Sequence, residues 1–234
     1  MIPATADHTS ALFDGIAPVY DRVNTVVSAG TDRFWRARVR KALPPGDALR
    51  VLDVATGTGE IAFELLRSPR VAEVVGVDPA AQMLAMAERK AKTIPRGGDV
   101  RFQQMDAIAL AFDDASFDVV TVAFGVRNMT DPVAALRELR RVLRPGGRLL
   151  VLEFSLPASA LVRGPFLVYF RHVLPRVGGW ISGKEDAYRY LNRSVEGFPY
   201  GEDFAEILRN VGLRDVRFDP LSLGIATLYQ GSAP

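Results

Sequence analysis

The sequence predicts an α/β fold in which a parallel sheet binds a nucleotide-like ligand. Short apolar runs alternate with helical patterns along the chain, as expected for a parallel sheet covered by helices. Residues 51–60, VLDVATGTGE, indicate a strand, a tight turn at Gly57 and Gly59, and the start of a helix. Asp78 closes the next apolar run, where a carboxylate can accept hydrogen bonds from both hydroxyls of a ribose.

The remaining elements follow in order after this first unit. We expect strands at 73–77, 100–105, 117–123 and 148–154, and helices at 80–92, 132–143 and 204–211. Two further runs, 214–218 and 223–229, are joined by Asp219-Pro220-Leu221-Ser222. Because this connection is short enough for a hairpin, the seventh and last strand should be antiparallel to the rest.

Two segments lie outside this repeat within one domain of residues 1–234. Residues 1–45 are expected to form a helical cap, broken near Gly30, and residues 33–41 (RFWRARVRK) within it carry five cations. Such a run suits either an anionic membrane surface or a solvated helix face. Residues 156–202 form an insertion after the fifth strand, and its aromatic residues either wall a bulky apolar acceptor or pack the insertion onto the sheet. They are Phe166, Tyr169, Phe170, Trp180, Tyr188, Tyr190, Phe198 and Tyr200.

Composition narrows the class of protein. A chain of 234 residues with 48% hydrophobic content can bury one sizeable core. It has no run of about 18 apolar residues and no apolar leader, so we expect a cytosolic protein. The absence of cysteine excludes disulfides and a cysteine nucleophile, and with two histidines no metal site is expected. A net charge of +2 gives no indication of a nucleic-acid partner.

The identity of the nucleotide depends on the charges beside the glycine turn. Gly57, Gly59 and Ala62 formally fit the dinucleotide pattern G-x-G-x-x-A. Asp53 and Glu60, however, flank the place where a pyrophosphate would sit and would repel it. S-adenosylmethionine brings an ammonium and a sulfonium instead, so we favour this cofactor. An NAD-dependent oxidoreductase is the alternative from a different class.

Polar residues also end the third and fourth strands. Asp106 is placed to bind an adenine amino group or to cap a following helix, and the two uses are compatible. Arg127 and Asn128 follow the fourth strand and offer a cation and an amide. These groups suit an acceptor that passes through an anion. The Asn/Asp-Pro-Pro-aromatic pattern expected of methyltransferases acting on nucleic-acid bases is missing here.

The sequence resembles the quinone-biosynthesis C-methyltransferase family over nearly its whole length. RVLRPGG is general to class I methyltransferases, whereas FGVRN, LEFS and the matching residues between 190 and 199 are specific to the family. The stretches that carry the resemblance are FDGIAPVYD at 13–21 with Asn24 and Ser28, residues 53–59, FGVRN at 124–128, RVLRPGG at 141–147, LEFS at 152–155, and Tyr190, Leu191, Ser194, Phe198 and Pro199.

The resemblance implies a class I S-adenosylmethionine-dependent methyltransferase with a Rossmann-like sheet. It assigns Thr56, Asp78, Asp106 and Ala107 to the cofactor, and it places Tyr20, Arg127 and Asn128 at the quinol as catalytic residues. The predicted cofactor-binding set is Asp53, Thr56, Gly57, Gly59, Asp78, Met83, Asp106, Ala107 and Phe124, and the predicted substrate-binding set is Phe13, Tyr188 and Tyr190.

The implied reaction is methylation of a ring carbon of demethylmenaquinol, a polyprenyl naphthoquinol. Glu60 stands where the family usually has Asp, which keeps the charge. Ala123 stands where ubiquinone-pathway members can show Ser, which slightly favours the menaquinone substrate. Methylation of the methoxy-polyprenyl-benzoquinol of ubiquinone biosynthesis, a related O-methyltransferase, and a non-catalytic scaffold stay open. So do a homodimer and peripheral contact with the inner face of the cell membrane.

Overall fold

The computed structural model describes Asp21, Thr25, Val26, Ser28, Gly30, residues 31–183 and residues 185–234. Its strands are β1 (Leu49–Val54), β2 (Val71–Asp78), β3 (Val100–Gln104), β4 (Phe117–Ala123), β5 (Leu143–Phe154), β6 (Arg214–Leu221) and β7 (Ala226–Ser232). Its helices are α3 (Thr31–Lys41), α4 (Glu60–Leu66), α5 (Ala81–Ala91), α6 (Pro132–Val142), α7 (Ala160–Val168), α8 (Leu174–Ser182), α9 (Glu185–Gly197) and α10 (Glu202–Asn210). Short helical turns are η2 (Gly97–Asp99), η3 (Val126–Asn128), η4 (Tyr169–Val173) and η5 (Ser222–Gly224).

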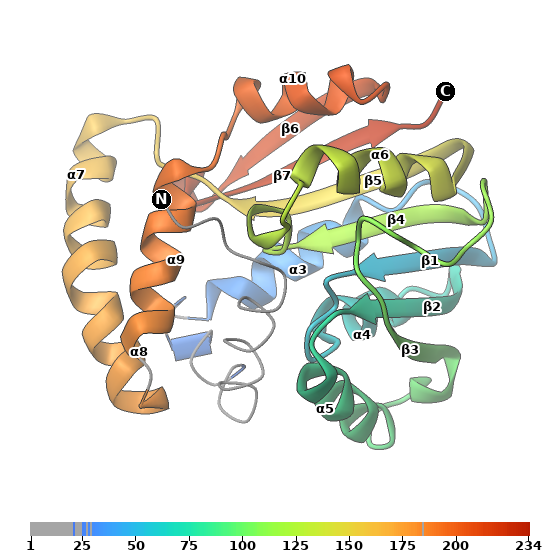
Figure 1. Cartoon of the computed structure of the whole chain (residues 1–234), viewed down its shortest axis with the longest axis horizontal. Coiled ribbons are helices and arrows are strands. Elements are labelled where there is room, and N and C mark those ends of the chain that lie inside the picture. Colours follow the sequence, from blue (N-terminus) through green and yellow to red (C-terminus); the bar gives the residue numbers. More distant parts are fainter. Residues whose placement is uncertain (1–20, 22–24, 27, 29, 184) are drawn as a thin grey trace.

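The seven strands form one sheet in the order β3-β2-β1-β4-β5-β7-β6. Strands β1 to β5 are parallel, and β7 is antiparallel to both β5 and β6. This confirms the predicted fold, including the antiparallel last strand. The order reverses at β1 and β4, whose carboxyl ends point toward the insertion helices (Figure 1). Ligands of open parallel sheets bind at such a reversal.

The RPGG turn lies within β5 rather than before it. Phe117 pairs with Leu143 and Val119 pairs with Arg148, so the turn bulges out of a strand that begins five residues earlier than predicted. A Cβ on Gly147 would lie 2.8 Å from the carbonyl oxygen of Arg144. Because a contact this short would force the backbone apart, only glycine fits the bulge.

The C-terminal hairpin is also displaced from its predicted position. Its connection runs through η5, while Asp219, Pro220 and Leu221 belong to β6. Pro220 pairs with Thr227 in a strand that lies at the edge of the sheet. An edge strand tolerates proline because one side of its backbone needs no ladder partner. The predicted connection, residues 219–222, is therefore about three residues too early.

The strands alternate their side chains between two helical layers. Leu52 and Val120 pack with α6 and α10 on one face, and Val51 and Val119 pack with α3 and α4 on the other. All four strand residues are fully buried. Strands β1 and β4 are therefore apolar on both sides, which explains their near-continuous apolar runs in the sequence.

Helix α3 begins where the sequence predicted a break. Gly30 has a left-handed φ of 77° and precedes the first turn, so the chain can enter the helix from a tight bend. Three of the five cations of α3 form ion pairs: Arg36 pairs with Glu60, Arg38 with Asp219 and Arg40 with Glu64. These ion pairs dock the cap onto α4 and β6. Contact of α3 with a membrane stays a prediction.

The insertion consists of α7, η4, α8 and α9, and it stands beside the carboxyl ends of the strands (Figure 1). Helix α8 packs on α9. No helix in the described ranges combines the length and the apolar character that crossing a bilayer requires. The insertion is therefore positioned to cover the site described next.

Candidate active site

The glycine turn joins β1 to α4 through left-handed backbone. Gly57 has φ 55° and Gly59 has φ 84°, values that favour glycine. A Cβ on Gly59 would lie 2.8 Å from the Phe63 ring. Ala55, at the start of the turn, also has a positive φ of 53°. Non-glycine residues in this region are uncommon and concentrate at functional sites.

Asp78, at the end of β2, fixes the turn from the neighbouring strand. One carboxylate oxygen accepts a hydrogen bond of 2.8 Å from the backbone N–H of Gly57, and the other accepts one of 2.8 Å from that of Ala80. These bonds hold both oxygens in place at the end of the strand. The carboxylate also faces a cavity, so it is preorganised for a ligand that brings hydroxyl donors.

A cavity opens at the carboxyl ends of β1, β2 and β4. Six of the nine predicted cofactor-binding residues line it: Gly57, Asp78, Met83, Asp106, Ala107 and Phe124. Predicted catalytic Asn128 lines it too. The other lining residues are Val54, Ala55, Pro79, Ala80, Met105, Ala123, Gly125, Met129 and Thr130. The walls are mostly apolar, and the polar side chains are few, as in sites for flat organic ligands.

Asp53 and Thr56 lie beneath this cavity rather than on its wall. The Asp53 carboxylate is 1% exposed and accepts hydrogen bonds from the hydroxyls of Thr56 (2.6 Å) and Thr121 (2.7 Å). Burial raises the pKa of Asp53 to about 6, and the two hydroxyls oppose this rise. The structure thus does not place Asp53, Thr56 or Gly59 in the lining, and their predicted contact with a cofactor stays a prediction.

Asp53 should make stability depend on pH. Its folded pKa of about 6 lies above the usual 3.8, so the folded state binds this proton more tightly than the unfolded chain does. The resulting stability is complete below about pH 4 and is lost as pH rises through about 6. Relative to Asp53→Asn, the wild type should lose about 2 kcal/mol of unfolding free energy between about pH 4 and pH 7. Urea unfolding of both proteins across this range measures the difference, and parallel curves would contradict it.

Asp106 stands after β3 at a turn rather than at a helix. Its carboxylate accepts a hydrogen bond of 3.1 Å from the N–H of Ile108, and Ala109 donates to its carbonyl. The prediction that a helix starts after Asp106 is therefore wrong, because the residues that follow β3 form a turn. The capping interaction itself is present, and the half-buried side chain still lines the cavity.

The loop after β4 is shaped by Phe124 and Gly125. Phe124 has a φ of 55°, and its carbonyl oxygen accepts hydrogen bonds from Arg127 (2.6 Å) and Asn128 (3.2 Å). A Cβ on Gly125 would lie 2.6 Å from the Cβ of Ala55, across the cavity floor. The FGVRN sequence thus closes β4 onto the turn after β1, and both strand ends take left-handed backbone there.

Arg127 is not among the described residues that line the cavity, and its predicted contact with the acceptor stays a prediction. Its guanidinium is 6% exposed, lies over the Phe154 ring, and donates a hydrogen bond of 2.5 Å to Glu153. Glu153 is 1% exposed and also accepts from the N–H of Phe154. A buried charge needs a partner of this kind. The geometry therefore makes Arg127 a support of the loop, held in place by Glu153.

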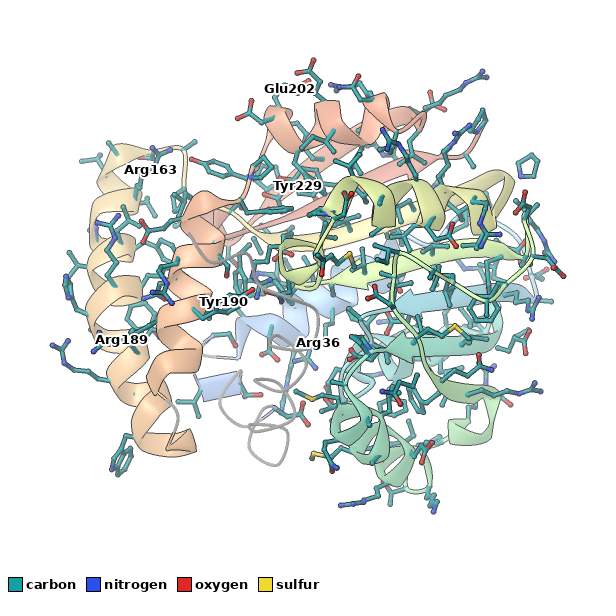
Figure 2. All side chains as sticks on the ribbon, viewed as in Figure 1. Arg36, Arg163, Arg189, Tyr190, Glu202 and Tyr229 are labelled. Atoms are coloured by element: carbon teal, nitrogen blue, oxygen red, sulfur yellow. The ribbon has the colours of Figure 1, made fainter. Side chains whose placement is uncertain are left out.

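Asn128 and Tyr190 connect the loop to the insertion. The Tyr190 hydroxyl, on α9, donates a hydrogen bond of 3.2 Å to the side-chain oxygen of Asn128, and Figure 2 shows Tyr190 on that helix. Phe13 and Tyr20 lie outside the described residues, and for Tyr188 only the backbone of α9 is described. Of the three predicted substrate residues, the structure brings Tyr190 to a residue of the cavity.

The aromatic residues of the insertion do not form one wall. Phe170 is buried and stacks on Phe166, and Phe198 packs against Phe204 of α10. Tyr169 and Trp180 point to solvent. The sequence predicted an aromatic-rich insertion. Because side chains on a helix point in different directions, some of its aromatic residues face the protein and others face solvent.

The N-terminal cap reaches the glycine turn through Asp21. The Thr58 hydroxyl donates a hydrogen bond of 2.6 Å to Asp21, and Lys90 of α5 pairs with both Asp21 and Glu60. Glu60, whose charge was expected to repel a pyrophosphate, is thus compensated by Lys90 and Arg36. Among the described residues, the carboxylates that line the cavity are Asp78 and Asp106 instead.

The profile of the ubiE/COQ5 methyltransferase family matches residues 2–233. The chain belongs to this family. A demethylmenaquinone methyltransferase of Deinococcus radiodurans is 48% identical over 221 residues, which cover 94% of this chain and 90% of the relative. That of Thermus thermophilus is 47% identical over 95% of this chain and 100% of the relative. The ubiquinone/menaquinone biosynthesis C-methyltransferase UbiE of Syntrophotalea carbinolica is 45% identical over 95% and 93%.

Solved structures support the fold of this ubiE/COQ5 family member. A SAM-dependent methyltransferase from Thermotoga maritima superposes with a TM-score of 0.69 at 21% identity, covering 96% of this chain and 99% of that one. The [4+2]-cyclase SpnF gives the same TM-score at 17% identity, covering 100% and 98%. Because a cyclase shares the fold, the fold alone does not fix the reaction.

Sequence reasoning missed Glu153 and several lining residues. Glu153 lies in the quoted LEFS stretch, but no local pattern indicated that it would pair with Arg127. Ala55 and Met105 directly follow strands β1 and β3, and Gly125 is the second residue after β4, so all three line the cavity. Their position after the ends of predicted strands could have identified them as lining residues.

Proposed function

We propose that this protein transfers the methyl group of S-adenosylmethionine to a ring carbon of demethylmenaquinol and yields menaquinol. Membership of the ubiE/COQ5 methyltransferase family and relatives named demethylmenaquinone methyltransferase support this substrate. The observation that carries the proposal is the cavity that joins the Asp78 carboxylate, at the end of β2, to the FGVRN loop that is specific to the family.

The residues of the cavity fit an adenosyl group. The Asp78 and Asp106 carboxylates both line the cavity, where the first can accept from ribose hydroxyls and the second from an amino group of adenine. Met83, Met105 and Ala107 supply apolar surface for a flat ring. A pyrophosphate would meet two carboxylates, Asp78 and Asp106, and the described lining residues include no cation. When bound, S-adenosylmethionine supplies an electrophilic methyl group on a sulfonium.

The acceptor carbon must gain electron density before it can take the methyl group. Loss of the phenolic proton of the quinol provides that density, whereas the oxidised quinone is electron-poor. The ring carbon then forms its bond to the methyl group, the carbon–sulfur bond breaks, and the ring proton is lost to restore aromaticity. We place Asn128 beside the acceptor oxygen, with Tyr190 fixing its amide. A water molecule is our proposed proton acceptor.

The prenyl tail and the second ring of the acceptor set the remaining specificity. Relatives of similar identity carry both the menaquinone and the ubiquinone names. Ala123 lines the cavity where a ubiquinone-pathway member can present a hydroxyl, and this apolar contact favours the naphthoquinol. Methylation of a benzoquinol is the second candidate function.

Incubation with labelled S-adenosylmethionine and a panel of demethylated quinols tests the proposal. We expect label in menaquinol, detected by mass spectrometry, only when a reductant keeps the acceptor reduced. An NADH titration by thermal shift serves as the control for the oxidoreductase alternative. Turnover of the oxidised quinone without reductant, or label at oxygen rather than carbon, would contradict the mechanism.

A further inference from the structure

One face of the insertion exposes large apolar side chains. Nine large hydrophobic side chains are exposed among the described residues, and five of them lie between residues 161 and 180. They are Leu161, Val168, Tyr169, Val173 and Trp180. Leu161 is 89% and Trp180 is 88% exposed. Because single exposed apolar residues are ordinary and a cluster is not, this grouping indicates a binding surface.

These five side chains form a stripe along one side of a continuous helical segment, which we call the outer stripe. Helix α7, turn η4 and helix α8 follow one another without a break from Ala160 to Ser182. The opposite side carries Phe170 and Leu174, each 2% exposed, and Asn192 of α9 donates a hydrogen bond of 2.6 Å to the Phe170 carbonyl. At 1.5 Å per residue the outer stripe is about 28 Å long.

The charge around the outer stripe is of one sign. Residues 156–183 contain Arg163, Arg171, His172 and Arg176 but no aspartate or glutamate. Glu196 of α9 compensates Arg171. Arg163 and Arg176 donate to the backbone carbonyls of Pro157 and His172 and thus keep their full charge. Apolar and aromatic side chains beside arginines that have no ion pair within the described part of the chain suit an anionic surface with an apolar interior.

We propose that the outer stripe docks this protein on an anionic lipid bilayer, with Leu161 and Trp180 at the boundary between headgroups and acyl chains. Trp and Tyr prefer this boundary because their rings are apolar and their N–H or O–H groups are polar. Arg163, which Figure 2 shows on α7, and Arg176 then meet lipid phosphates. The outer stripe thus differs from α3, in which Arg36, Arg38 and Arg40 are engaged in ion pairs.

The position of the outer stripe agrees with the proposed function. The link drawn here between the bilayer and the cavity rests on that function, whereas the docking surface itself does not. Helices α7 and α8 form the outermost layer of the insertion, and α9 lies between them and the sheet (Figure 1). Tyr190 of α9 in turn contacts Asn128 at the cavity. With helices spaced about 10 Å apart, the bilayer would lie roughly 20 Å from the cavity. A quinol with an insoluble tail would then be methylated next to the membrane that holds it.

Flotation with phosphatidylcholine vesicles, with and without phosphatidylglycerol, tests the outer stripe. The double variant Leu161→Ser/Trp180→Ser should bind vesicles at least about tenfold more weakly than the wild type. Arg176→Gln should lose about fivefold, and only on the anionic vesicles. The matched controls Phe34→Ser on α3 and Leu223→Ser near the hairpin remove exposed apolar groups elsewhere and should bind as the wild type does.

Tryptophan fluorescence gives a second readout that does not depend on sedimentation. The chain has two tryptophans, and Trp35 is already buried at 3% exposure. A blue shift on adding anionic vesicles therefore reports Trp180 entering an apolar environment. Thermal unfolding of each variant checks that the fold is intact, which we expect because the substituted side chains are exposed.

Three results would overturn the proposal. The first is wild-type protein that neither floats nor shifts its fluorescence. The second is equal binding by the wild type and the Leu161→Ser/Trp180→Ser variant, or loss in Phe34→Ser instead. The third is a concentration-dependent blue shift without vesicles, which would assign the stripe to a second copy of the chain. Methylation of a tail-less naphthoquinol, measured in parallel, tests the proposed function separately, because this acceptor needs no membrane.

Discussion

Replacing Arg127 with methionine is expected to lower the free energy of unfolding by about 3 to 5 kcal/mol. The substitution leaves the Glu153 carboxylate buried at 1% exposure without its 2.5 Å partner, and it removes one of the two side-chain hydrogen bonds to the Phe124 carbonyl. An uncompensated charge costs far more in this position than the same loss at the surface. Arg144→Met is the matched control, because Arg144 is 47% exposed and its partner Asp118 is partly solvated.

A double-mutant cycle with Glu153→Gln separates support of the loop from direct contact with the acceptor. Arg127→Met/Glu153→Gln removes both charges, so it should regain part of the lost stability. If Arg127 supports the loop, kcat with the quinol should recover along with stability. Recovered stability with a kcat that stays low would show instead that the guanidinium acts on the acceptor anion. Urea unfolding and steady-state kinetics on the four proteins supply both quantities.

Replacing Asp78 with alanine is expected to weaken the binding of S-adenosylhomocysteine by about a hundredfold or more. Each charge-assisted hydrogen bond to the ribose is worth about 1.5 kcal/mol or more, and two of them are lost. The variant also releases the N–H groups of Gly57 and Ala80, which now hold the glycine turn. Adenosine contains the same ribose, so its affinity should fall by a similar factor.

Isothermal titration calorimetry measures both affinities, and Asp118→Ala provides the control. Asp118 also accepts a backbone hydrogen bond, of 2.8 Å from Arg50, but it does so away from the cavity. Its replacement should leave ligand binding unchanged. An unaltered affinity in Asp78→Ala would remove this carboxylate from the site, and thermal unfolding without ligand shows whether the turn alone was damaged.

The sequence by itself determined the fold class, the glycine turn and the family. These features are local: the apolar runs are continuous because strands such as β1 and β4 are buried on both faces, and the left-handed backbone at Gly57 and Gly59 favours glycine. Asp78 could be predicted for the same reason, since the end of a parallel strand beside the turn is fixed by topology. Six predicted cofactor residues accordingly meet at one cavity.

Only the tertiary structure decided which polar groups face that cavity and which are buried behind it. Asp53 and Asp78 both belong to the same sheet edge, yet Asp53 lies beneath the cavity with two threonine hydroxyls. Arg127 turns to Glu153, which is 26 residues away in sequence, and Trp180 turns outward while Phe170 turns inward. Such orientations depend on partners brought together by packing between elements, and no local pattern in the chain records them.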